Sequence, residues 1–304
     1  MKKFIKIITS LFIVITSCLY ILDQNGYLNN TSFALSNKDE ETLKTSKINN
    51  GNLKIYFLDV GQADSILIRE NNKNVLIDAG NNEDGPKLVN YIKSLGIESF
   101  DYVIGTHPHE DHIGGMDDII NNFEIKKFYM PDAITTTKTF EDVLDALEEN
   151  NLKFNTPEEK EVFKLDDASF KVIYVGDDKK DLNNTSIVLK LTYGNTSYLF
   201  TGDATNKTEK QILNEDIKAT VLKVGHHGSQ YSSSNEFLDK VSPSYAIISA
   251  GKNNIYGHPK DITLKKLNKR NIKIYRTDEM GTIIISSDGN KISIDEEKTD
   301  TNGW

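Results

Sequence analysis

Short apolar runs alternate with helical stretches between residues 53 and 295. Apolar positions three or four apart predict helices, most clearly where Leu88, Val89 and Ile92 form one stripe that Gly96 ends. Helices are expected at 85–95, 140–149, 208–213, 235–241 and 262–270. Short runs bounded by turn residues predict strands. Strands are expected at 53–58, 65–69, 74–77, 101–106, 169–175, 185–192, 196–201, 220–224, 245–249, 273–276, 281–286 and 291–294. Two packed mixed sheets with helices outside would account for this order, which places the chain in the mixed α/β class.

The two ends of the chain lack this pattern. Residues 1–22 join three lysines to an apolar stretch at 4–22, which is typical of an export signal or a membrane anchor. The length of that stretch is near the minimum for a membrane span. Residues 23–52 are polar without a hydrophobic period, so we expect a disordered or extended linker there. Residues 296–304 form a similar polar tail, and the folded domain is expected at 53–295.

The single cysteine, Cys18, leaves the mode of attachment open. Residues 15–18 resemble the lipobox of bacterial lipoproteins, whereas the apolar run continues past Cys18 as in an uncleaved anchor. Cleavage after Ala34 would instead release a secreted protein. All three alternatives export the domain to the cell surface or beyond. Because residues 51–304 contain no cysteine, the domain has no disulfide and no thiolate metal ligand.

All six histidines fall in three short clusters. Histidine used as an ordinary half-buried residue would be scattered. Imidazole together with carboxylate suits Zn²⁺, Mn²⁺ or Fe. His107 and His109 can bind one ion, and the adjacent Asp111 and His112 can bind a second one nearby. The remaining histidines are His226, His227 and His258. A short helical run is expected after the first cluster, beyond Gly114-Gly115.

These clusters and three further motifs resemble those of metallo-β-lactamase-fold hydrolases, and among them the hydrolase domain of ComEC-type competence proteins. The similar segments are HPHEDH at 107–112, FLDVGQADS at 57–65, VLIDAG at 75–80, YLFTGDA at 198–204, LKVGHHGS at 222–229 and YGHP at 256–259. The resemblance spans about residues 53–294. It implies a four-layer αββα sandwich with the metal-binding loops along one edge, and it makes Asp203 the ligand that bridges two ions.

The chain departs from the general pattern of this fold in one segment. Many members carry a further metal-binding histidine between the first cluster and Asp203, whereas residues 182–189 read LNNTSIVL. The ComEC-like subgroup is similar in having Asn and Ser there, which makes Asn184 and Ser186 candidates for contacts around the metals or with the substrate. One ion then needs another ligand, which is His226, His227 or water. The sequence leaves open which of the two adjacent histidines coordinates.

The predicted cofactors are two divalent metal ions, Zn²⁺ or Mn²⁺, which lower the pKa of a shared water to about 7 and yield hydroxide at neutral pH. The candidate ligands are His107, His109, Asp111, His112, Asp203, His226 and His227. The candidate catalytic groups are Asp111 and His258. His258 would donate a proton to a leaving oxygen or bind a phosphate oxygen.

Further polar residues near the motifs have two interpretations each. Asp59, Asp64 and Asp78 either orient metal-bound imidazoles through the free ring nitrogen or simply form turns. The hydroxyl of Ser229 either donates to a substrate anion or belongs to a solvated turn.

The charge distribution limits the partners. The chain has 36 basic and 45 acidic residues. Six of the basic and four of the acidic residues lie in residues 1–50, so residues 51–304 carry a net charge of −11. An acidic body is a poor platform for nonspecific binding of nucleic acid. Residues 260–276 are an exception, with seven basic residues against Asp261. This basic flank is either a polyanion-binding surface beside the metals or a solvated helix face.

Together these features predict an exported metal-dependent hydrolase that cleaves a phosphodiester, as a phosphodiesterase or DNase. A teichoic-acid or phosphocholine esterase, another small-ester hydrolase, and a noncatalytic binding module on the same fold remain alternatives. The predicted partners are a phosphodiester substrate, either DNA or a cell-wall polymer, and the membrane through the N-terminal segment.

The substitution Cys18→Ser tests the N-terminal alternatives. We expect an immunoblot of membrane fractions to show a larger, uncleaved precursor if Cys18 is lipidated, and no change if residues 4–22 form an uncleaved span. In both cases external protease should degrade the domain on intact cells. Degradation only after lysis would contradict export.

Overall fold

The structure is a computed structural model that describes residues 53–178 and 180–297. Its strands are β1 (Leu53–Phe57), β2 (Ser65–Glu70), β3 (Lys73–Ala79), β4 (Ser99–Phe100), β5 (Tyr102–Ile104), β6 (Glu124–Ile125), β7 (Phe128–Tyr129), β8 (Phe154–Asn155), β9 (Val162–Lys164), β10 (Ser169–Tyr174), β11 (Val188–Tyr193), β12 (Thr196–Phe200), β13 (Val221–Lys223), β14 (Tyr245–Ile248), β15 (Lys273–Arg276), β16 (Thr282–Ser287) and β17 (Ile292–Glu297). Within the described residues, these strands form two large sheets and a small pair. The first sheet has the order β17-β16-β1-β2-β3-β5-β7-β8, the second has the order β15-β14-β13-β12-β11-β10-β9, and β4 pairs with β6.

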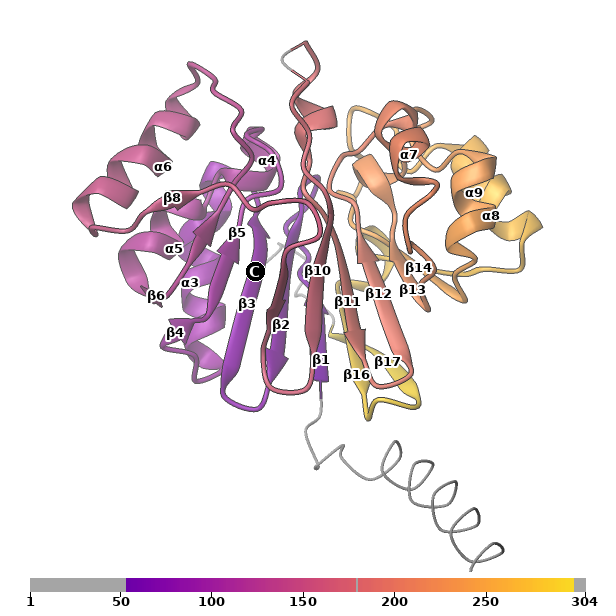
Figure 1. Cartoon of the computed structure of the whole chain (residues 1–304), viewed down its shortest axis with the longest axis horizontal. Helices are drawn as coiled ribbons and strands as arrows, with labels where there is room; N and C mark the ends of the chain where they lie inside the picture. The colour runs from indigo at the N-terminus through magenta and orange to yellow at the C-terminus, as the bar shows by residue number, and fades with distance from the viewer. Residues whose placement is uncertain (1–52, 179, 298–304) are drawn as a thin grey trace, which may run out of the picture. The chain divides into compact units, whose positions relative to one another are not determined.

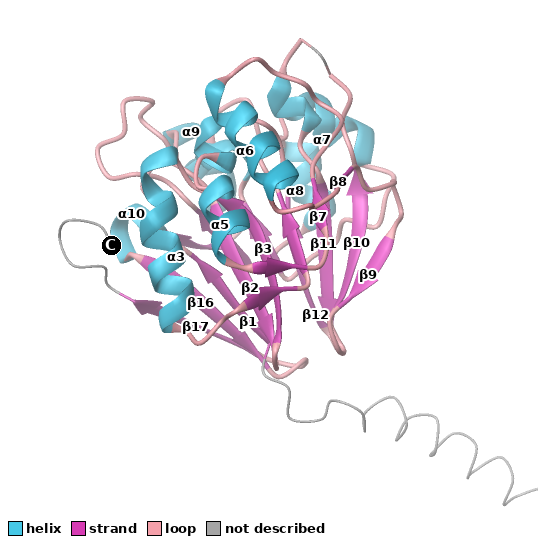
Figure 2. Cartoon of the chain, turned by 90° about the vertical axis from the view of Figure 1, so that its left-hand side faces the viewer, coloured by secondary structure: helices cyan, strands magenta, loops and turns pink. Residues whose placement is uncertain are grey.

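Helices cover the outer faces of both sheets (Figures 1 and 2). The helices are α3 (Gly85–Ser94), α4 (Glu110–Ile113), α5 (Met116–Asn122), α6 (Lys138–Glu149), α7 (Asn206–Ile212), α8 (Asn235–Val241), α9 (Asp261–Lys269) and α10 (Thr277–Met280). Three 3₁₀ turns are η1 (Asn82–Asp84), η2 (Leu182–Thr185) and η3 (Gly225–Gly228). Apolar side chains of α3, α5 and α6 pack on the first sheet, and those of α7, α8 and α9 pack on the second. This arrangement confirms the predicted four-layer αββα sandwich.

The two sheets bury their facing sides against each other. In β1, Tyr56 packs against the side chains of the helical layer. Its neighbours in the strand, Ile55 and Phe57, are fully buried. The rings of Phe57 and Phe200 lie 6.3 Å apart, one from each sheet. Because the central strands are covered on both faces, their sequences are nearly continuous apolar runs, as in the first predicted strands.

Most predicted elements are present, with differences at their boundaries. The strand expected from residue 185 begins at Val188, because residues 182–185 form η2. This turn begins after Asp181, whose side chain accepts a hydrogen bond from the backbone N–H of Asn183. The predicted polar tail starts two residues too early, since β17 continues through Glu297. That end of the strand is polar yet ordered, because it pairs with β16 and Tyr91 donates a 2.7 Å hydrogen bond to Glu297.

Short elements were the ones missed by the sequence pattern. They are β4, β6, β7, β8, β9, α4 and α10, most of them only two or three residues long. Such runs carry too few positions to show a period.

The N-terminal predictions concern residues outside the described part of the chain, including the segment 1–22, Cys18 and the linker 23–52. Among residues 53–178 and 180–297, no helix has both the length and the apolar character needed to cross a membrane.

Parallel pairing determines where the predicted motifs gather. β3 runs parallel to β5, while β12, β13 and β14 are parallel neighbours in the second sheet. Ligand-binding residues commonly follow the carboxyl ends of parallel strands. The segments after β5, β12, β13 and β14 carry the histidine clusters and Asp203, and so they bring these residues to one edge of the sandwich.

Candidate metal centre

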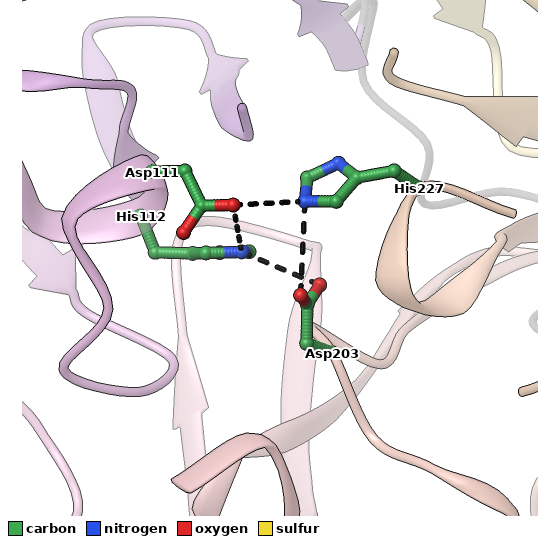
Figure 3. Close-up of side chains that lie close together, drawn as sticks. All are labelled: Asp111, His112, Asp203 and His227. Carbon is green, nitrogen blue, oxygen red and sulfur yellow. Dashed lines mark ion pairs between the residues drawn. The ribbon is translucent and has the colours of Figure 1, made fainter. Parts of the chain in front are cut away.

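Four predicted ligands converge at this edge, as Figure 3 shows. Asp111, His112, Asp203 and His227 each offer a ligand atom, and these atoms all lie within 4.8 Å of one another. His227 Nε2 is 3.3 Å from Asp111 Oδ2 and 3.7 Å from Asp203 Oδ2, and His112 Nε2 is 3.3 Å from Asp203 Oδ1. Two ligands come from α4, one follows β12 and one follows β13. We call these four residues the central cluster.

Asp78 holds the ring of His112. Its Oδ2 is 2.8 Å from His112 Nδ1, and its two oxygens also accept from the backbone N–H and the hydroxyl of Thr106. An ionised carboxylate only accepts, so Nδ1 carries a hydrogen, and Nε2 is the nitrogen that faces the cluster and can bind an ion in place of a proton. This is the contact that the predicted orienting role of Asp78 requires. Asp78 has a φ of 61°, a strained value for a residue with a side chain, which is typical of functional sites.

His227 is oriented in a similar way from the second sheet. Its Nδ1 lies 3.1 Å from the carbonyl oxygen of Ser249 and 3.5 Å from Asp64 Oδ1. A carbonyl oxygen accepts but cannot donate, so Nδ1 carries the hydrogen and Nε2 is available to an ion. His226 and His227 both have a φ of 52°. His227 is buried in the central cluster, whereas His226 is partly exposed, with its Nε2 3.6 Å from Asp203 Oδ2.

His107 and His109 form a separate pair beside the central cluster. His107 Nε2 lies 3.0 Å from His109 Nδ1, and the ring of His107 lies 4.1 Å from that of His112. Burial and the nearby charge of His112 hold the pKa of His107 well below its usual value, which leaves the ring neutral and able to bind a metal. This pair is a second set of imidazole donors beside the central cluster, and the charge of Asp203 acts on His107. His226, whose Nε2 lies 3.6 Å from Asp203 Oδ2, is a further possible donor next to these histidines.

The electrostatics of the central cluster fit a divalent cation. Burial opposes the ionisation of Asp111 and Asp203, but the charges of His112 and His227 outweigh it and lower the pKa of both carboxyl groups. In turn, the surrounding carboxylates raise the pKa of His112 despite its burial. His112 Nε2, His227 Nε2 and Asp203 Oδ1 are buried without a hydrogen-bond partner. A divalent cation bound by these atoms would satisfy all three and replace the charge of the protons.

The cluster opens into a cleft of about 330 Å³, which is also lined by Gln62, Asn183, Tyr256 and His258. The ring of His258 lies 5.7 Å from that of His226 and stacks on Tyr256 at 5.8 Å. Burial and the charges of His227 and His226 lower the pKa of His258 to about 4. A neutral ring is a poor proton donor at pH 7, so His258 is better suited to the second of its predicted roles, a hydrogen bond to a substrate oxygen.

The other predicted residues lie around the cluster rather than in it. Ser186 accepts from the backbone N–H of Asp203 at 3.1 Å, and Asn184 accepts from Thr205 and Thr208. Both therefore shape the segment that carries Asp203. Asp59 accepts from the N–H of Gly61 within its own turn. The buried hydroxyl of Ser229 accepts from Tyr231 N. For Asp59 and Ser229, these contacts favour the turn interpretation.

Sequence reasoning missed three residues of the site. Lys223 is buried and pairs with Asp64, and its signal was a charged residue within an apolar strand. Thr106 links Asp78 to both His107 and His112. Asn183, rather than Asn184, faces the cleft, and its buried side-chain oxygen has no hydrogen-bond partner. Nothing in the sequence separates the two adjacent asparagines.

The chain is similar in sequence to proteins of a known family. The sequence model of the metallo-beta-lactamase superfamily matches residues 58–252. ComE operon protein 3 of Bacillus subtilis (strain 168) is 34% identical over 251 residues, which are 76% of this chain and 32% of that protein. Competence protein ComA of Neisseria gonorrhoeae is 28% identical over 230 residues, 74% of this chain and 31% of that protein. The chain thus spans about a third of the length of these curated relatives.

A solved structure supports the fold alone. The metallo-beta-lactamase fold protein YhfI from Bacillus subtilis aligns with a TM-score of 0.52 at 12% identity, over 74% of this chain and 95% of that chain.

Metal content tests the candidate centre. We expect the purified chain to retain close to two divalent ions per molecule. Asp203→Ala should remove most of them, because Asp203 belongs to the central cluster and is the bridging ligand that the resemblance implies. Elemental analysis after dialysis measures the content. Glu70→Gln is the matched control, since Glu70 is equally buried but binds the backbone N–H groups of residues 166–168. Full metal content in Asp203→Ala would rule out this centre.

Proposed function

The chain belongs to the metallo-beta-lactamase superfamily, and on that premise we propose that it is an exported metal-dependent phosphodiesterase. The observation that carries the proposal is the central cluster, in which two carboxylates and two correctly oriented imidazoles meet at the base of an open cleft. The intact donor set favours catalysis over a noncatalytic binding module, because a module that only binds has no need for it.

Divalent cations held by these residues would supply Lewis acidity, which activates water for attack and neutralises charge on a phosphate. The protein's own groups would perform the remaining tasks. Asp78, Asp64 and the Ser249 carbonyl fix the orientation of His112 and His227. His258, which also lines the cleft, would bind a nonbridging oxygen of the substrate. Asn183 offers a further polar atom to the cleft in the segment where many relatives of this fold carry a histidine.

The substrate proposed first is DNA, because the two relatives described above are named as competence or com-operon proteins. Contacts within the fold limit which basic side chains could bind DNA. Within the basic flank, Lys266 donates to Ser233 O, Arg270 pairs with Asp239, and Arg276 pairs with Asp278. Those side chains already have partners in the fold. Lys265 and Lys269 on α9 are exposed and remain available to a polyanion.

A second candidate is a phosphocholine-type ester of the cell wall. A cavity of about 220 Å³ is lined by Asp132, Ala133, Ile134, Asp177, Leu182 and Thr185. Its last two residues belong to η2, the same turn that presents Asn183 to the metal cleft. Carboxylates beside apolar groups repel a polyanion and suit a ligand that carries a positive charge. This feature favours the esterase alternative.

We also propose that the domain acts outside the cytoplasm, attached through residues 1–22. The support is the basic and apolar pattern of that segment together with a cysteine-free domain.

Activity on a small diester tests the proposed reaction. With Mn²⁺ or Zn²⁺, the full chain should hydrolyse bis-p-nitrophenyl phosphate, and chelation should abolish the rate until metal is restored. His258→Ala should lower kcat by about 10²–10³-fold with unchanged metal content, because it removes one hydrogen bond to the developing charge. Lys252→Ala, an exposed residue of the same loop, is the control. Undiminished activity after exhaustive chelation would refute the proposal.

The same assay on larger substrates separates the two candidates. If DNA is the substrate, the double substitution Lys265→Gln/Lys269→Gln should raise KM for single- or double-stranded DNA at low salt only, and leave the small diester unaffected. If a phosphocholine ester is preferred and Asp177→Asn weakens its binding, the esterase candidate replaces the nuclease.

A further inference from the structure

We infer that Lys223 is a positioning residue of the metal centre, whose ammonium group holds Asp64 where it places His227 and Asp111 in the central cluster. The inference rests on the metal binding in the proposed function and not on any substrate.

The ion pair between Lys223 and Asp64 lies entirely inside the sandwich. Both residues are 1% exposed, and Lys223 Nζ is 2.6 Å from Asp64 Oδ2. The ammonium group also donates to Val224 O at 3.2 Å. Lys223 ends β13 of the second sheet, while Asp64 precedes β2 of the first sheet. The pair therefore connects the two sheets at the level of the metal ligands.

Asp64 in turn contacts ligands from both sides. Its Oδ1 lies 3.5 Å from His227 Nδ1, and its backbone N–H donates to the carbonyl oxygen of Asp111 at 3.0 Å. Its own carbonyl oxygen accepts from Gly80 N at 2.9 Å. A displacement of Asp64 would shift the ring of His227 and the start of α4 together. These are the segments that supply three of the four ligands in the central cluster.

Stability alone does not explain such a pair. Removing two charges from water costs free energy, and replacing a buried ion pair by apolar residues is often neutral or stabilising. A role in the site does explain it. Asp64, Asp78 and His112 form a second group whose ligand atoms lie within 4.8 Å. By engaging Asp64, Lys223 offsets one carboxylate and keeps that group from competing with the central cluster for the cation.

Metal affinity and stability, measured separately, test this role. The full chain, Lys223→Met and the double variant Asp64→Asn/Lys223→Met are titrated with Mn²⁺ by calorimetry and with Co²⁺ by absorption spectroscopy. Urea unfolding is followed in chelator. Lys223→Met should lower the unfolding midpoint, because it leaves Asp64 buried without its partner. The double variant should recover most of that midpoint, yet bind one of its two ions about 10–100-fold more weakly and with an altered Co²⁺ spectrum.

Glu70→Gln is the control for destabilisation alone, because it removes a buried carboxylate that holds residues 166–168. It should lower the midpoint with parental metal affinity. Parental affinity and spectrum in the double variant would overturn the inference, as would equal weakening in Glu70→Gln. Lys223→Gln is a second test if the methionine variants do not fold, and parental affinity in it would also overturn the inference. If the unsubstituted chain binds no metal, it is the proposed function that fails.

Discussion

The arrangement of this protein depends on burying several carboxylates close together between two apolar sheets. Asp64, Asp78 and Asp203 are each about 1% exposed, and Asp111 borders them at the floor of the cleft. Burial of an unpaired carboxylate is costly, so each needs a positive charge or hydrogen-bond donors within reach. Lys223 serves Asp64, Thr106 and His112 serve Asp78, and the imidazoles serve the other two. A divalent cation is the partner that would best balance the two carboxylates of the central cluster, Asp111 and Asp203.

This constraint assigns the residues of the motifs to distinct tasks. Residues that offer an unpartnered atom to the cluster are the ligand candidates, and residues whose atoms already have partners orient them. Asp78 belongs to the second kind, because both of its oxygens accept hydrogen bonds. Asp64 pairs with Lys223 through Oδ2, while its Oδ1 has no hydrogen-bond partner and lies 3.5 Å from His227 Nδ1. Asp78, His226 and His227 have positive φ values, a strained backbone conformation that is common at functional sites. Because the ligands are held by other residues, they would keep their geometry when a substrate enters the cleft.

The short apolar runs of the sequence were sufficient to predict two mixed sheets with helices outside, and the resemblance carried by the motifs implied the four-layer sandwich. It was also sufficient to name the residues of the central cluster. It could not choose between His226 and His227, since adjacent residues differ only in how the turn directs them. It missed Lys223 because the partner Asp64 is 159 positions away and belongs to the other sheet. It chose Asn184 over Asn183 for a comparable reason, because which of two neighbours faces a cleft depends on the 3₁₀ turn around them.

The proposed function requires that Asp111, His112, Asp203 and His227 hold a divalent cation. Anomalous diffraction from crystals of the chain grown with Mn²⁺ tests it most directly. We expect an anomalous peak bound by His112 Nε2, His227 Nε2 and both carboxylates, with Lys223 still paired to Asp64. A fully occupied peak located instead among Asp64, Asp78 and His112, or no peak at saturating Mn²⁺, would contradict it.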